Sequence, residues 1–97
     1  SKQRSFLKGI AMTTEPIFQI GKSALTPELT TAVGEALEKR ELVKISVLQN
    51  CLDDPKDMAA RLADRTQSEV VQVIGKKIVL YRQAKEEKHR KIVLPRG

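Results

Sequence analysis

Two helix starts of the same kind organise the chain, and each is flanked by short segments rich in β-branched residues. At Thr26-Pro27 and at Asp54-Pro55, a residue that caps helices precedes a proline. Proline suits the first helical position because it has no N–H to leave unpaired. Residues 17–20, 42–48 and 70–74 surround these starts, and each segment is typical of a strand. Alternating strands and helices predict crossover connections and mainly parallel pairing, which argues against all-helical and all-β folds.

The two ends of the chain complete the expected order of elements. Residues 2–13 are predicted to form a helix whose apolar stripe consists of Phe6, Leu7, Ile10 and Ala11. Gly75-Lys76 favours a two-residue type II′ turn into a last strand at 77–82. The expected fold is therefore an α/β sandwich of the order α-β-α-β-α-β-β with a four-stranded mixed sheet. A chain of 97 residues has room for one core, so we expect one domain over 1–84 and a basic tail over 85–97.

The net charge of +6 is concentrated at the two ends of the chain. Residues 1–25 carry four basic side chains and one acidic, residues 83–97 carry five basic and two acidic, and the stretch between them carries nine of each. Basic charge gathered in this way is typical of a phosphate-binding surface. Because only three residues are aromatic, the composition argues against recognition by base stacking.

Several classes of protein are disfavoured by what the chain lacks. One cysteine and one histidine rule out a disulfide framework and argue against a metal site. No nucleophile has a base near it in the sequence, so we expect neither an enzyme nor a cofactor. The longest charge-free run covers the eight residues 45–52, whereas a membrane span needs about 18. With a reduced thiol and no signal peptide at the start, we expect a cytoplasmic monomer.

The most informative segment is the loop of Gly21, Lys22, Ser23 and Ala24, which lies between a strand and a helix start. Such a place offers backbone N–H groups and the positive end of a helix dipole to an anion. Lys22 adds a charge and Ser23 a hydroxyl donor. These properties suit a sugar–phosphate backbone, and KH-type domains use a Gly-x-x-Gly loop in this way. An ordinary connecting loop remains the alternative.

Other positively charged side chains are candidates for neutralising neighbouring phosphates. They are Lys2, Arg4, Lys8, Arg40, Lys44, Lys76, Lys77 and the basic tail. Alternatively, Lys44 belongs to the solvated face of a strand, and Lys76 and Lys77 are ordinary residues of a hairpin tip. Arg61 and Arg65 are one helical turn apart, and Asp57 four residues before Arg61 favours a solvated structural face there. Gly34 interrupts a helix, either as a tolerated defect or as a point where a partner approaches closely.

Three segments resemble the CRM domain, the YhbY-like family of chloroplast RNA splicing and ribosome maturation proteins. They are residues 18–26 (FQIGKSALT), 40–47 (RELVKISV) and 71–82 (VQVIGKKIVLYR). The resemblance implies an RNA-binding domain of the order read above, similar to the C-terminal domain of a bacterial translation initiation factor. It implies a stand-alone bacterial member that associates with precursors of the large ribosomal subunit.

The resemblance also places the family's Gly-x-x-Gly RNA-contact loop on Gly21, Lys22, Ser23 and Ala24. Ala24 stands where the family has its second glycine. If that position requires a positive φ, alanine costs on the order of 1 kcal/mol there or shifts the loop. The expected function is binding of structured RNA, ribosomal RNA above all, during large-subunit assembly. The alternative is a protein-interaction module whose basic ends serve solubility only.

Overall fold

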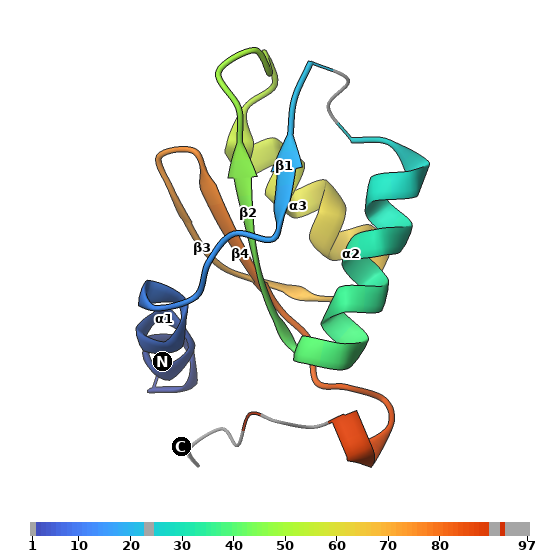
Figure 1. Ribbon diagram of the computed structural model, residues 1–97. Coiled ribbons are helices and arrows are strands. Elements are labelled where there is room, and N and C mark those ends of the chain that lie inside the picture. The colour runs from blue at the N-terminus through green and yellow to red at the C-terminus, as the bar shows by residue number, and fades with distance from the viewer. Residues whose placement is uncertain (1, 23–24, 90–91, 93–97) are drawn as a thin grey trace.

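The structure is a computed structural model, and it describes residues 2–22, 25–89 and 92 (Figure 1). The predicted order of helices and strands is confirmed, and a short 3-10 turn, η1, follows the last strand. The helices are α1 (Lys2–Met12), α2 (Pro27–Arg40) and α3 (Pro55–Thr66), and η1 covers Glu87–His89. The strands are β1 (Phe18–Ile20), β2 (Leu42–Val47), β3 (Glu69–Ile74) and β4 (Lys77–Tyr81).

The four strands form one mixed sheet in the order β1-β2-β4-β3. β1 and β2 are parallel, whereas β4 is antiparallel to both β2 and β3. Gly75 and Lys76 form the tip of the β3–β4 hairpin, with Ile74 opposite Lys77. Gly75 has φ +56°, as the first central residue of a II′ turn requires, and Lys76 is not among the residues with positive φ.

The starts of α2 and α3 follow the capping pattern read from the sequence. The Thr26 hydroxyl accepts a hydrogen bond from the Leu29 amide at 3.1 Å, and the Asp54 carboxylate accepts one from the Lys56 amide at 3.0 Å. Pro27 and Pro55 occupy the first helical positions. Each cap contributes about 1 kcal/mol to helix stability, so two local signals fix where both helices begin.

The main core lies between one face of the sheet and the helices α2 and α3, which cover that face together (Figure 1). Val43, Ile45 and Val47 point into it from β2, as their alternation predicts. The other fully buried side chains of this core include Ile20, Val33, Leu37, Met58, Leu62, Ile78 and Leu80. Burial of each large apolar side chain contributes roughly 1.5–3 kcal/mol, which makes this layer the principal source of stability.

Helix α1 covers part of the opposite face of the sheet, so this face is not simply solvated (Figure 1). Leu7 and Ala11 are buried against Val71, Val79 and Tyr81. Phe6, which was expected in the buried stripe, is 41% exposed. The reason is geometric: a short helix that lies across a sheet buries a narrower stripe than the four positions predicted.

The segment after β4 is attached to the end of α2 by two glutamates. The Glu41 carboxylate is fully buried and accepts the amides of Ala84 and Ile92, both at 2.8 Å. The Glu38 carboxylate accepts the amides of Lys85 at 2.9 Å and Glu86 at 3.1 Å. Glu41 itself is the C-cap of α2 and has φ 66°, a conformation that costs a non-glycine residue about 1 kcal/mol or more.

Candidate nucleic-acid interface

Three connections meet at one end of the sheet, which we call the loop edge: the β1–α2 loop, the β2–α3 loop and the β3–β4 hairpin (Figure 1). The amide of Leu48 donates to the carbonyl of Ile20 at 2.8 Å, which joins the ends of β1 and β2. The amide of Val47 donates to the carbonyl of Lys76 at 2.7 Å, which joins the end of β2 to the hairpin. The ends of β1 and β2 and the tip of the hairpin are therefore neighbours, although they lie far apart in the sequence.

The β1–α2 loop supplies an exposed cation to this edge, but fewer backbone donors than the sequence suggests. Gly21 is half-buried and Lys22 is exposed, whereas Ser23 and Ala24 lie outside the described residues. Pro27 has no amide, the Leu29 amide is used by the Thr26 hydroxyl, and the Thr30 amide by the Thr26 carbonyl. Lys22 is consequently the main source of positive potential from this loop.

Gly21 is held against the β2–α3 loop. A Cβ at position 21 would lie 3.5 Å from Oδ1 of Asn50 and 3.6 Å from Leu48 Cδ1, which are ordinary contact distances. The φ of Gly21 is not in the left-handed region. The β2–α3 loop was not among the predicted contacts, although the carboxyl ends of parallel strands meet at one edge of a sheet. That rule could have placed Asn50 beside Gly21.

The hairpin brings Lys76 and Lys77 to the loop edge, and both are exposed. The Lys77 ammonium donates to the Ser46 hydroxyl at 2.8 Å, so the side chain is directed along the end of β2. Three cations, Lys22, Lys76 and Lys77, are thus displayed by two connections of the same edge. Asp53 and Asp54, also exposed, lie in the third connection and bound the basic area on the α3 side.

The remaining predicted contacts are not gathered at this edge. Lys2, Arg4 and Lys8 belong to α1, where Arg4 and Lys8 are exposed, and Arg40 is exposed at the last residue of α2. Lys44 is half-buried, and its ammonium donates to the Ala11 carbonyl at 3.3 Å. Lys44 therefore anchors the end of α1, which the sequence could not reveal because the contact spans 33 residues.

The described residues contain no group of three or more His, Cys, Asp or Glu side chains that could hold a metal ion. No helix among them is long and apolar enough to cross a membrane. Cys51 is a buried free thiol that packs against the Met58 sulfur at 3.7 Å. Asp57 and Arg61 are both exposed, and no ion pair joins them in the described part of the chain.

The fold and this edge define a small α/β domain with an exposed basic end. The chain belongs to the CRS1 / YhbY (CRM) domain family, whose model matches residues 1–82. It is similar to "Probable RNA-binding protein YqeI" of Bacillus subtilis, with 47% identity over 90% of this chain and 91% of that protein. An "RNA-binding protein" of Haemophilus influenzae is 33% identical over 99% of this chain and 94% of its own length.

A solved structure supports the architecture independently. The solution structure of a hypothetical protein from Staphylococcus aureus, described as a candidate RNA-binding protein, matches with a TM-score of 0.77 and 46% sequence identity. The match covers 97% of this chain and 96% of that one. The family and the four-stranded sandwich expected from the sequence are thereby confirmed.

Proposed function

We propose that the protein binds structured RNA through the loop edge, and that its ligand is ribosomal RNA within a precursor of the large ribosomal subunit. The observation that carries the proposal is that Lys22, Lys76 and Lys77 are exposed at the same end of the sheet. The family membership and the names of the two relatives support RNA as the ligand class. The protein acts by binding alone, as a cytoplasmic monomer without a cofactor.

Phosphate contacts dominate this mode of binding. The amino-terminal end of α2 and Lys22 seat a backbone phosphate or ribose, while Lys76 and Lys77 neutralise phosphates across the same edge. The aromatic side chains do not form a stacking platform, because Tyr81 is buried and Phe18 packs against the main core. Phe6 is exposed, but it belongs to α1 and is a single aromatic ring. Affinity should therefore depend strongly on salt and weakly on base sequence.

The Lys22→Gln variant tests the loop, with Lys39→Gln as its matched control. Lys39 is an exposed lysine in the last turn of α2, away from the loop edge. Binding is measured by fluorescence anisotropy with a labelled structured fragment of large-subunit ribosomal RNA at several salt concentrations. Loss of one phosphate contact should reduce the slope of log affinity against log salt by about 1, whereas Lys39→Gln should leave the slope unchanged.

Two outcomes would contradict the proposal at different levels. If both variants bind RNA as the wild type does, the β1–α2 loop is not the contact. If the wild type binds neither ribosomal RNA nor an unrelated structured transcript even at low salt, the RNA-binding function itself is wrong. In that second case the basic ends serve solubility, and a protein partner becomes the favoured ligand.

A further inference from the structure

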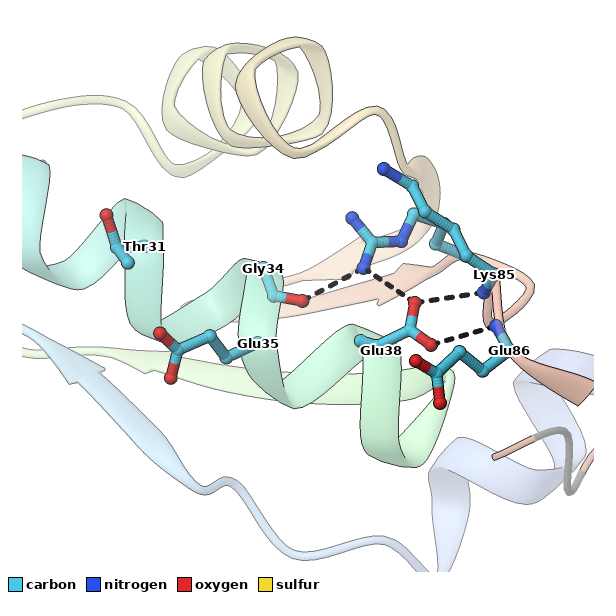
Figure 2. Close-up of a pocket in the computed structure, with 7 residues that line it drawn as sticks. Thr31, Gly34, Glu35, Glu38, Lys85 and Glu86 are labelled. Carbon is cyan, nitrogen blue, oxygen red and sulfur yellow. Dashed lines mark hydrogen bonds and ion pairs between the residues drawn. The ribbon is translucent and has the colours of Figure 1, made fainter. Parts of the chain in front are cut away.

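A groove separate from the loop edge lies between α2, the end of α3 and the segment after β4. It consists of two adjoining hollows of about 430 and 330 Å³. Both are lined by Thr31, Gly34, Arg82 and Lys85. Figure 2 shows the larger hollow, with Thr31, Gly34 and Glu35 on α2 and Lys85 and Glu86 on the segment after β4. We call this surface the α2–α3 groove.

The smaller hollow is basic and contains no acidic residue. Its charged lining residues are Arg65, Arg82 and Lys85, and the others are threonines, Gly34 and Gln67. Arg65 and Lys85 are exposed, and neither side chain forms an ion pair within the described part of the chain. Arg65 and Lys85 therefore have no carboxylate partner in this hollow, whereas the charge of Arg82 is partly offset by Glu38. Together the three cations still create a positive potential that favours an anion.

Arg82 is held in place by two backbone carbonyls and one carboxylate. Its guanidinium donates to the Thr66 carbonyl at 2.8 Å and to the Gly34 carbonyl at 3.0 Å, and it lies 3.7 Å from the Glu38 carboxylate. Its Nε is buried without an acceptor. A fixed guanidinium loses little conformational freedom when it binds a phosphate, since its planar fork is already oriented.

The acidic side chains nearby are confined to the larger hollow, and two of the three are engaged. Glu38 accepts two backbone amides and contacts Arg82 (Figure 2). Glu86 forms an ion pair with Lys88 at 3.3 Å. Glu35 is the third carboxylate and is exposed. The anion-accepting part of the groove is therefore the half next to Arg65.

Gly34 forms the floor of the groove, and no requirement of the fold itself explains a glycine there. Its φ is not in the left-handed region, and a Cβ at this position would meet only Thr66 Cγ2, at 3.9 Å. A glycine inside a helix costs about 1 kcal/mol relative to alanine. The absent side chain leaves the space between α2 and α3 open to a ligand.

We propose that the α2–α3 groove is a second phosphate-binding site, which seats the backbone of the same RNA that contacts the loop edge. This inference rests on the proposed function. Gly34 lies seven residues beyond Pro27, which corresponds to about 10 Å along α2. One RNA strand can therefore run from Lys22 along α2 into the groove, where Arg65, Arg82 and Lys85 neutralise a phosphate and Thr31 offers a hydroxyl donor.

The Gly34→Ala variant separates this role from a structural one, because the two roles predict opposite changes in the melting temperature. Alanine should raise the melting temperature by improving helix propensity, while its methyl group, at the groove floor, should weaken RNA binding about threefold or more. The control is Gly9→Ala in α1, where a Cβ would also meet open space. Gly9→Ala should raise the melting temperature without affecting the RNA affinity.

A second pair of variants tests the charge. Arg65→Gln should reduce the salt slope of RNA binding by about 1, and Arg61→Gln should leave it unchanged. Arg61 is exposed one turn earlier on α3 and does not line the groove. Both pairs are measured by fluorescence anisotropy with the labelled ribosomal RNA fragment used for Lys22→Gln.

The outcomes distinguish this inference from the proposed function. If the wild type binds RNA with a steep salt dependence and neither Gly34→Ala nor Arg65→Gln weakens binding, the groove is not a contact, while the loop edge stands. If wild-type binding is absent, both proposals are wrong. If Gly34→Ala lowers the melting temperature, the fold itself requires the glycine. In that case, an unchanged salt slope for Arg65→Gln would show that the groove does not bind RNA.

Discussion

Among the polar side chains, we expect the buried carboxylate of Glu41 to contribute most to holding the segment after β4 against α2. It is 0% exposed, has a positive φ and accepts the amides of Ala84 and Ile92 at 2.8 Å each. The Glu41→Gln substitution keeps the side-chain volume, but it replaces one acceptor oxygen by an NH₂ group. This donor then faces the N–H of a backbone amide. One charge-assisted hydrogen bond is lost, and a backbone amide is left without its acceptor.

The expected cost follows from these contacts. A hydrogen bond to a charged group contributes about 1.5–3 kcal/mol, and an unsatisfied buried donor costs about 1–3 kcal/mol. Relief from burying a charge offsets part of this sum, so we expect a net destabilisation of about 2–4 kcal/mol. For a domain of this size that lowers the melting temperature by at least about 8 °C. Differential scanning calorimetry measures the shift, and hydrogen exchange at the Ala84 amide reports the lost bond locally.

The control for this prediction is Glu35→Gln, an exposed glutamate on the same helix. Its effect on the free energy of unfolding should stay within about 0.5 kcal/mol. A melting temperature of Glu41→Gln within about 2 °C of the wild type would refute the reasoning. It would mean that the segment after β4 is not attached to α2 through this carboxylate.

Two further substitutions probe the same end of the fold. Gln67→Gly should stabilise the protein by about 0.5–1 kcal/mol, because Gln67 is the left-handed C-cap of α3 with φ 56° and ψ 42°; a lower midpoint in urea would contradict this. Arg82→Lys should destabilise by about 1.5–3 kcal/mol, because an ammonium on a shorter stem cannot bridge the carbonyls of two helices as the guanidinium does; an unchanged urea midpoint would show that the bridge contributes nothing.

The parts of the fold that sequence predicts well are those fixed by neighbours in the chain. Thr26-Pro27 and Asp54-Pro55 begin helices because cap and proline act within one turn. Gly75 sets the hairpin because a positive φ at that position is a local requirement. The alternation in β2 identifies its buried face for the same reason, since it needs no knowledge of the partner strands.

The parts that sequence misses depend on contacts across many residues. No local pattern in the sequence marks Glu41, yet its carboxylate accepts hydrogen bonds from amides 43 and 51 residues away. Arg65 was assigned to a solvated face, but the segment after β4 brings Lys85 and Arg82 next to it. The backbone donors expected at the start of α2 are partly used by Thr26, a consequence of the very cap that locates the helix.

The sequence indicates which lysines the loop edge contains better than it indicates how the fold arranges them. Lys22, Lys76 and Lys77 share an edge because β1, β2 and the hairpin end at the same level of the sheet. Lys44, in contrast, is occupied by the Ala11 carbonyl. Gly34, whose cost in a helix the fold does not explain, lines the α2–α3 groove.

The salt dependence of wild-type binding to large-subunit ribosomal RNA tests the central claim most directly. Affinity is measured between about 50 and 200 mM salt, and the slope of log affinity against log salt counts the phosphates contacted. The three lysines of the loop edge predict a slope of about −3, and the added cations of the α2–α3 groove would bring it to about −5 or −6. A slope near zero, or no binding at the lowest salt, would contradict the account.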